Sequence, residues 1–112
     1  MNIQRGEIIR VNLNPTEGRE QSENARLCLV ISHTKYNITR QGIVIVTPIT
    51  NTIKPEIKLM IPIPDGFKIQ GSIIAEQVRT LDLNQRWWKT TGEVLPKDFV
   101  DSVVQTFSVI IS

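Results

Sequence analysis

The chain has 112 residues, of which 40% are hydrophobic and 21% charged, and its formal net charge is +2. This length suits one small domain with one core, and the apolar content argues against a disordered chain. We therefore expect a single domain over residues 1–112. The mild positive charge is compatible with a nucleic-acid partner but does not by itself indicate one.

Cysteine usage and the N-terminal segment point to a reducing, aqueous setting. The one cysteine, Cys28, excludes an internal disulfide and a cysteine-based metal site, and its apolar neighbours over 27–31 indicate a small buried hydrophobe. The first ten residues carry charges and no apolar core, so we expect no signal peptide. No apolar run approaches the roughly 20 residues of a membrane helix, and we expect a cytoplasmic protein that does not enter a membrane.

The first half of the chain predicts strands separated by polar connections. Residues 7–13 alternate between apolar and polar side chains, which predicts a half-buried strand. Residues 27–31 are apolar throughout, as in a central strand covered on both faces. Turn formers over 32–41 predict a short helical turn, and the β-branched run 43–46 predicts a third strand. Pro48 lacks a backbone donor, so we expect that strand to end or bulge there.

The second half predicts further strands and then a change of period. Residues 56–61 alternate again, and residues 69–77 predict a fifth strand in which Gly71 can mark a bulge. Residues 80–84 predict a turn or short helical piece, and residues 90–94 a last short strand. After Pro96 the period becomes helical, and one face of the predicted helix carries Phe99, Val100, Val103, Val104, Phe107, Ile110 and Ile111.

The order of these elements predicts the fold class. Strands do not alternate with helices, which argues against a parallel doubly wound sheet. The simplest arrangement is mainly β: a small antiparallel sheet curls into a partial barrel, and the C-terminal helix packs on it.

A long polar connection over residues 14–26 separates the first two predicted strands. Loops of about 12 residues in a compact domain are usually functional or disordered. This one ends at Arg26, where the next strand begins, so a rigid sheet can aim the guanidinium. Taken alone, the simpler interpretation is a solvated hairpin loop with a salt-bridging arginine.

Three sequence blocks stand out, in this order along the chain. They are Arg5-Gly6-Glu7-Ile8 with Asn14-Pro15-Thr16, Gly18-Arg19-Glu20-Gln21 and Arg26; Thr47-Pro48-Ile49-Thr50; and Glu76-Gln77-Val78-Arg79-Thr80-Leu81-Asp82. Together they resemble the MazF/PemK/Kid ribonuclease toxins of type II toxin–antitoxin systems. The resemblance covers nearly the whole chain and implies an SH3-like partial barrel of the MazF/CcdB plasmid-toxin type. It also implies a sequence-specific endoribonuclease, an mRNA interferase, that cuts single-stranded RNA as a homodimer and is inhibited by a cognate antitoxin.

The chemistry that this chain offers suits RNA cleavage without a metal. One histidine and one cysteine give no metal-ligand cluster, and no glycine-rich phosphate loop is present. RNA supplies its own nucleophile, the ribose 2′-hydroxyl, which attacks the adjacent phosphorus. Arginine suits the remaining task, because it stays ionised and presents a planar fork to phosphate. We expect no cofactor and no metal.

The resemblance also implies roles for particular residues. Arg26 would stabilise the transition state or the leaving group, and Thr50 would hydrogen-bond the scissile phosphate or the 2′-hydroxyl. Glu76 stands where some members carry an acidic base, and its alternative role is a carboxylate paired with Arg26 or Arg79. The amides of Gln21 and Gln77 can read bases or be ordinary surface polarity. The candidate RNA-binding residues are Arg19, Gln21, Gln77, Arg79 and Arg86.

Departures from the family pattern leave alternatives open. Ile74 stands where some members carry a second catalytic arginine, so that version of the mechanism is excluded, and Leu27 replaces a common proline. A CcdB-like gyrase poison on the same fold would need a C-terminal tryptophan segment, which residues 108–112 lack. A relative without activity that only binds a partner is the third interpretation. Trp87 and Trp88 should point opposite ways, one toward the core and one toward solvent.

Overall fold

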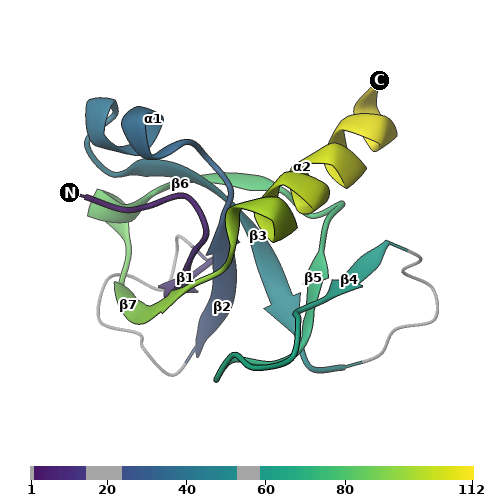
Figure 1. Ribbon diagram of the computed structural model, residues 1–112. Coiled ribbons are helices and arrows are strands. Elements are labelled where there is room, and N and C mark those ends of the chain that lie inside the picture. Colours follow the sequence, from purple (N-terminus) through teal and green to yellow (C-terminus); the bar gives the residue numbers. More distant parts are fainter. Residues whose placement is uncertain (1, 15–23, 53–58) are drawn as a thin grey trace.

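A curled antiparallel sheet forms most of the structure, a computed structural model that describes residues 2–14, 24–52 and 59–112 (Figure 1). The strands are β1 (Glu7–Asn12), β2 (Ala25–Val30), β3 (Ile43–Thr50), β4 (Met60–Pro62), β5 (Ser72–Ile74), β6 (Arg79–Asp82) and β7 (Trp88–Val94), and the helical elements are α1 (Thr34–Thr39), the short 3-10 helix η3 (Leu83–Gln85) and α2 (Lys97–Ile111). The strand order in the sheet is β4-β5-β3-β2-β1-β7, and β6 lies off this path and pairs with β3. β3 is the central strand, because it pairs with β2, β5 and β6.

The mainly β class with a C-terminal helix is confirmed. All strand pairs recorded in the described ranges are antiparallel, and Figure 1 shows α2 lying across the curled sheet. No helix in those ranges is long and apolar enough to cross a membrane.

Most residues on both faces of β1, and those of β2 from Cys28 to Val30, are buried, because the sheet curls around one core and carries α2 on another. One hydrophobic cluster joins Ile8 and Leu29 to residues of α2, among them Val100. The opposite faces of the same strands contribute Ile9 and Cys28 to a second cluster. The two-sided burial predicted for β2 is confirmed. The half-buried strand predicted for 7–13 is corrected in part, since Ile8 and Asn12 on its second face are buried whereas Arg10 on that face is exposed.

The strand β3 continues through Pro48, which corrects the predicted break. Ile45 directs its backbone toward β2, where its carbonyl accepts the Ile31 N–H at 2.9 Å. Successive residues of a strand face alternate neighbours, so Pro48 directs its backbone nitrogen to the other side. On that side β6 pairs with residues 43–46 and β5 with residues 49–50. The proline falls at the change of partner, where a missing N–H costs no ladder hydrogen bond.

The strands of the second half differ in extent from the prediction. β4 spans Met60–Pro62, and residues 56–58 of the predicted strand lie outside the described residues. β5 covers only Ser72–Ile74 of the predicted 69–77. The turn predicted for 80–84 is wrong in its first part, because residues 79–82 form β6 along β3 before η3 begins. The last strand, β7, begins two residues earlier than predicted.

Gly71, the residue before β5, lies close to the end of β3. Its φ is +129°, and a Cβ built there would lie 2.8 Å from the Thr50 carbonyl oxygen. Only glycine meets both conditions without strain. A residue that precedes β5 therefore sets the approach of β5 to Thr50.

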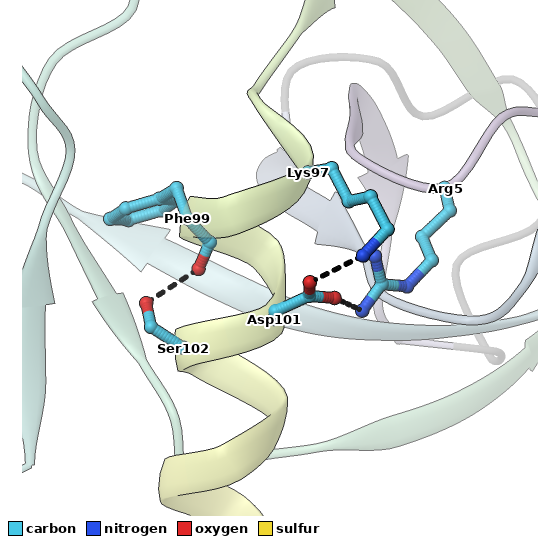
Figure 2. Close-up of polar contacts among 5 residues, drawn as sticks. All are labelled: Arg5, Lys97, Phe99, Asp101 and Ser102. Carbon is cyan, nitrogen blue, oxygen red and sulfur yellow. Dashed lines mark hydrogen bonds and ion pairs between the residues drawn. The ribbon is translucent and has the colours of Figure 1, made fainter.

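The C-terminal helix is held at its N-terminal half. Val100 and Val103 are buried, whereas Ile110 and Ile111 are 43% and 67% exposed, so the apolar face predicted for the whole helix is covered only in its first turns. The Asp101 carboxylate forms ion pairs with Arg5 Nη2 and Lys97 Nζ, each at 2.7 Å (Figure 2). Hydrogen bonds from Lys97 and Arg5 lower the pKa of Asp101. Arg5 thereby ties the segment before β1 to α2.

Candidate active site

Arg26 and Thr50 lie on neighbouring strands at the same end of the sheet. β2 and β3 pair with Cys28 opposite Pro48 and Leu29 opposite Thr47, and the same register continued by two residues sets Arg26 opposite Thr50. Residues opposite each other in an antiparallel pair share one face, with Cβ atoms about 5 Å apart. Both residues line one open groove of about 400 Å³, with Arg10, Ala25, Leu27, Ile49, Asn51 and Thr52.

The Arg26 side chain is exposed and available to a ligand. Among the described residues it has no ion pair and no hydrogen-bond partner, since the two ion pairs found there both involve Asp101. The salt-bridged arginine of the simpler interpretation is therefore not observed in this part of the chain. An exposed guanidinium near the first residue of a paired strand is suited to bind a phosphate group.

The Thr50 hydroxyl is oriented by the backbone that follows it. Its Oγ1 accepts the N–H of Thr52 at 3.1 Å, which fixes the side chain at the end of β3. Its own proton has no acceptor within the described ranges, so it can be donated to an oxygen of a bound phosphate. The role predicted for this threonine at the scissile phosphate stays a prediction.

A second groove, of about 620 Å³, continues on the other side of Arg26. Its lining includes Gln77 and Arg79, two of the residues predicted to bind RNA, together with Asn12, Leu13, Asn14, Asn24, Arg26 and Pro48. Arg79 remains exposed while its Nη2 donates to the Leu13 carbonyl at 3.1 Å. Because Arg26 belongs to both grooves, the structure brings Gln77 and Arg79 into one surface with Arg26 and Thr50.

Arg86 occupies a supporting position. Its Nη1 donates to the Asn12 carbonyl at 3.0 Å, and the buried Nε of this half-buried residue has no hydrogen-bond partner among the described residues. Burial lowers the pKa of the Arg86 guanidinium, and the nearby charge of Arg79 lowers it further, while Asp82 acts in the opposite sense. Arg86 lines neither groove and instead braces the end of β1, so its contact with RNA stays a prediction.

Glu76 lies apart from the pair. It is exposed in the turn that follows β5, and it lines neither of the two grooves, although the next residue, Gln77, lines one of them. It forms no ion pair with Arg26 or Arg79 in the described part of the chain. The structure thus supports neither the paired carboxylate nor a direct contact with Thr50, and the base role stays a prediction. Arg19 and Gln21 lie outside the described residues.

Cys28 and His33, the other possible nucleophile and base, have structural positions in the fold. Cys28 is fully buried, and burial raises its pKa to about 12 despite the opposing charges of Arg26 and Arg79. A thiol in this state is inert at neutral pH. The Nδ1 of His33 accepts the N–H of Lys35 at 3.0 Å at the start of α1. No cluster of three metal-ligating side chains occurs within residues 2–14, 24–52 and 59–112.

Two features of the surface escaped the sequence prediction. Arg10 lines the groove of Arg26 and Thr50, and the signal for it was its place as the exposed member of an otherwise buried strand. The tryptophans are both half-buried: Trp88 packs against the second cluster as predicted for one of them, whereas Trp87 is not fully exposed.

The site formed by these residues is an open groove on a small antiparallel sheet, and it presents an arginine and a threonine. The family model of the PemK-like, MazF-like toxins of type II toxin–antitoxin systems matches residues 4–111, and the chain belongs to this family.

Individual relatives agree with this assignment. The chain is 30% identical over 93 residues to the endoribonuclease toxin ChpB of Escherichia coli, with 80% of this chain and 78% of ChpB covered. It is 31% identical over 99 residues to the endoribonuclease MazF9 of Mycobacterium tuberculosis, with 82% of each covered. The fold matches the crystal structure of a MazE–MazF complex from Deinococcus radiodurans with a TM-score of 0.79 at 20% identity, over 100% of this chain and 97% of that one.

Proposed function

We propose that this protein is the toxin of a type II toxin–antitoxin system and that it cleaves single-stranded RNA at a short sequence. Membership of the family and relatives named as endoribonucleases support this function. The observation that carries it is the opposition of Arg26 and Thr50 in one open groove, with the Arg26 side chain free in the described part of the chain.

The proposed reaction uses the 2′-hydroxyl of the substrate as nucleophile. Its oxygen bonds to the adjacent phosphorus, the bond from phosphorus to the 5′ oxygen of the next nucleotide breaks, and the products carry a 2′,3′-cyclic phosphate and a free 5′-hydroxyl. One proton leaves the 2′-hydroxyl, and one joins the leaving oxygen. Arg26 stabilises the charge that grows on the phosphoryl or leaving oxygens, which is usually the largest catalytic contribution. Thr50 donates a hydrogen bond that holds the phosphate in line.

The proton acceptor is the open part of this mechanism. A threonine hydroxyl is a poor base at its ordinary pKa, so Thr50 serves in positioning. We propose Glu76 as the base, acting from the turn beside Gln77 once RNA occupies the groove. The chemistry requires neither a metal nor another cofactor, because the substrate supplies the nucleophile and arginine the positive charge.

Substrate recognition is assigned to the surface that extends from Arg26 toward Arg79. Gln77 has the donor and acceptor needed to read the edge of a splayed base, and Arg79 offers a charge to the backbone. Arg19 and Gln21, in the same connection that leads to Arg26, are proposed to contact RNA as well. Arg86 supports this surface through its hydrogen bond to the Asn12 carbonyl.

The partners follow from the family. The toxin is proposed to act in the cytoplasm as a homodimer and to be inhibited by a cognate antitoxin, since the family belongs to toxin–antitoxin systems and a solved relative was crystallised as a MazE–MazF complex. An antitoxin that blocks RNA would occupy the grooves around Arg26.

The test is incubation of the purified protein with a long single-stranded RNA in excess EDTA, followed by mapping of the ends. We expect cuts at one short sequence that leave 2′,3′-cyclic phosphates. Arg26→Ala should abolish them, whereas Arg40→Ala, a matched change at an exposed position directly after α1, should not. Intact RNA with a folded wild-type protein would contradict the proposal, and a topoisomerase assay for gyrase poisoning would follow.

A further inference from the structure

Two positive charges face each other across the strands β1 and β7. The register sets Arg10 directly opposite Lys89, and both side chains are exposed. Like charges in this arrangement destabilise a sheet. No ion pair relieves either charge within the described residues, where both ion pairs are made to Asp101. The two side chains are therefore suited to bind an anion from outside the chain.

A third groove, of about 490 Å³, lies over this pair. It adds Lys68 as a third cation, and its lining is completed by Leu27, Ile69, Thr90, Thr91 and Glu93. We call it the Arg10 groove. The one carboxylate among its described lining residues is that of Glu93, whose Oε1 accepts the N–H of Ile69 at 3.0 Å.

The threonine hydroxyl groups that line the Arg10 groove donate hydrogen bonds within the protein. Thr90 Oγ1 donates to the Glu7 carboxylate, and Thr91 Oγ1 donates to the Ile8 carbonyl at 2.6 Å. Neither hydroxyl proton is left for a ligand. Recognition of an anion in this groove thus falls to the three cations Arg10, Lys68 and Lys89.

The Arg10 groove is continuous with the candidate active site through shared residues. Arg10 and Leu27 line both this groove and the one that contains Thr50. Arg26 in turn joins that groove to the one that contains Arg79. Among the described residues, the charged ones that line this succession of three grooves are Arg79, Arg26, Arg10, Lys68 and Lys89, against the single carboxylate of Glu93.

We propose that Arg10, Lys68 and Lys89 form a second phosphate-binding subsite, which holds the RNA backbone at a distance from the bond that is cut. The inference rests on the proposed function and adds to it a preference for substrates longer than the cleaved segment. Phosphate contacts of this kind strengthen binding without reading sequence. They also release counterions, so the subsite contributes to the salt dependence of binding, by about 0.7 in slope for each charge on a single strand.

The experiment compares two RNAs that contain the mapped cut sequence, one of about four nucleotides and one of about twenty. Both carry a 2′-O-methyl group at the cut to prevent cleavage. Their Kd values are measured over a series of salt concentrations with the full-length wild type and with the double variant Lys68→Gln/Lys89→Gln. The control is Lys35→Gln/Arg40→Gln, which removes the same charge from α1 and the residue that follows it, outside the three grooves.

For the long RNA we expect the Lys68→Gln/Lys89→Gln variant to lose affinity and to lower the salt slope by about 1.4, which is two charges at 0.7 each. Affinity for the short RNA and kcat on its cleavable form should not change, nor should the control variant differ from wild type. Thermal unfolding should show a variant at least as stable as wild type, because the repulsion with Arg10 is removed.

Three results would overturn the subsite. One is an unchanged affinity and salt slope for the long RNA while the wild type still cuts RNA, which leaves the proposed function standing. Another is an equal loss on the short and the long RNA, which would assign the charges to the scissile site. The third is a loss of antitoxin binding alone, which would assign the groove to that partner. A wild type that neither binds nor cuts RNA would instead reject the proposed function itself.

Discussion

Arg26, the second residue of β2, and Thr50, the last residue of β3, each lie two residues beyond the antiparallel pair of Cys28 and Pro48, and both line the same groove. Two paired strands hold them, so their separation is set by the sheet and not by a loop. The proposed catalytic pair therefore has a fixed geometry before any substrate arrives.

Removal of the Arg26 charge should abolish activity without unfolding the protein. The side chain is exposed, so Arg26→Ala should leave the urea midpoint within error of wild type. The loss of a donor aimed at developing charge should lower kcat/KM for a fluorogenic RNA by at least about a hundredfold. Arg26→Lys should restore only part of it, because lysine keeps the charge but not the planar fork. An Arg26→Ala protein that cuts as fast as wild type would refute the assignment.

The hydroxyl of Thr50 should matter more than its shape. Thr50→Val keeps the volume and removes the donor, and a lost hydrogen bond to a charged group predicts a roughly ten- to hundredfold decrease in kcat. Thr50→Ser should retain most of the activity. Thr39→Val, on the exposed side of α1, is the matched control. Equal activities of Thr50→Val and Thr50→Ser would show that the hydroxyl has no role.

Gly71 should be needed to keep β5 beside Thr50. In Gly71→Ala the new methyl group would meet the Thr50 carbonyl oxygen at 2.8 Å, and the φ of +129° is unfavourable for alanine. We expect a loss of stability of about 1–3 kcal/mol in urea unfolding, together with reduced activity. Gly66→Ala provides the comparison, because its φ of +99° is also positive but nothing lies within 4 Å of the added carbon. A Gly71→Ala protein no less stable than Gly66→Ala would contradict the close approach.

Acid should weaken the attachment of α2. The pKa of Asp101 is lowered in the folded protein by hydrogen bonds from Lys97 and Arg5. A carboxyl group of this kind stabilises the fold above its unfolded pKa of about 3.9, and this contribution is lost as the pH falls through the lower folded value. Urea midpoints between pH 6 and pH 2 should therefore fall less steeply in Asp101→Asn than in wild type. Asp65→Asn, in an exposed turn, should follow wild type. Parallel curves for Asp101→Asn and wild type would reject the linkage.

The sequence predicted those parts of the fold that depend on local patterns. The apolar run of β2 and the helical period of α2 identified their elements, and the position of Arg26 at the start of a strand identified the leading candidate of the site. The course of β3 through Pro48 could not be predicted, because it depends on a change of strand partner. For the same reason β6 was mistaken for a turn, since its partner lies more than thirty residues away in the sequence.

The site was predicted less completely than the fold. Thr50 and Arg79 were found through the family blocks, and the structure brings both into grooves that Arg26 lines. Glu76 was assigned from the same block, yet it lies in a turn outside those linings. Arg10 was recognised only as part of a strand pattern, because its closeness to Lys68 and Lys89 arises from tertiary structure.

The burial of Cys28 makes the protein convenient for site-specific labelling. The chain has no other cysteine, and the pKa of about 12 keeps this thiol protonated at the neutral pH of a maleimide reaction. A cysteine introduced at an exposed position, such as Lys35 on α1, would then be the one reactive thiol of the folded protein. A fluorophore attached there would report binding of RNA or antitoxin without any need to replace Cys28 in the core.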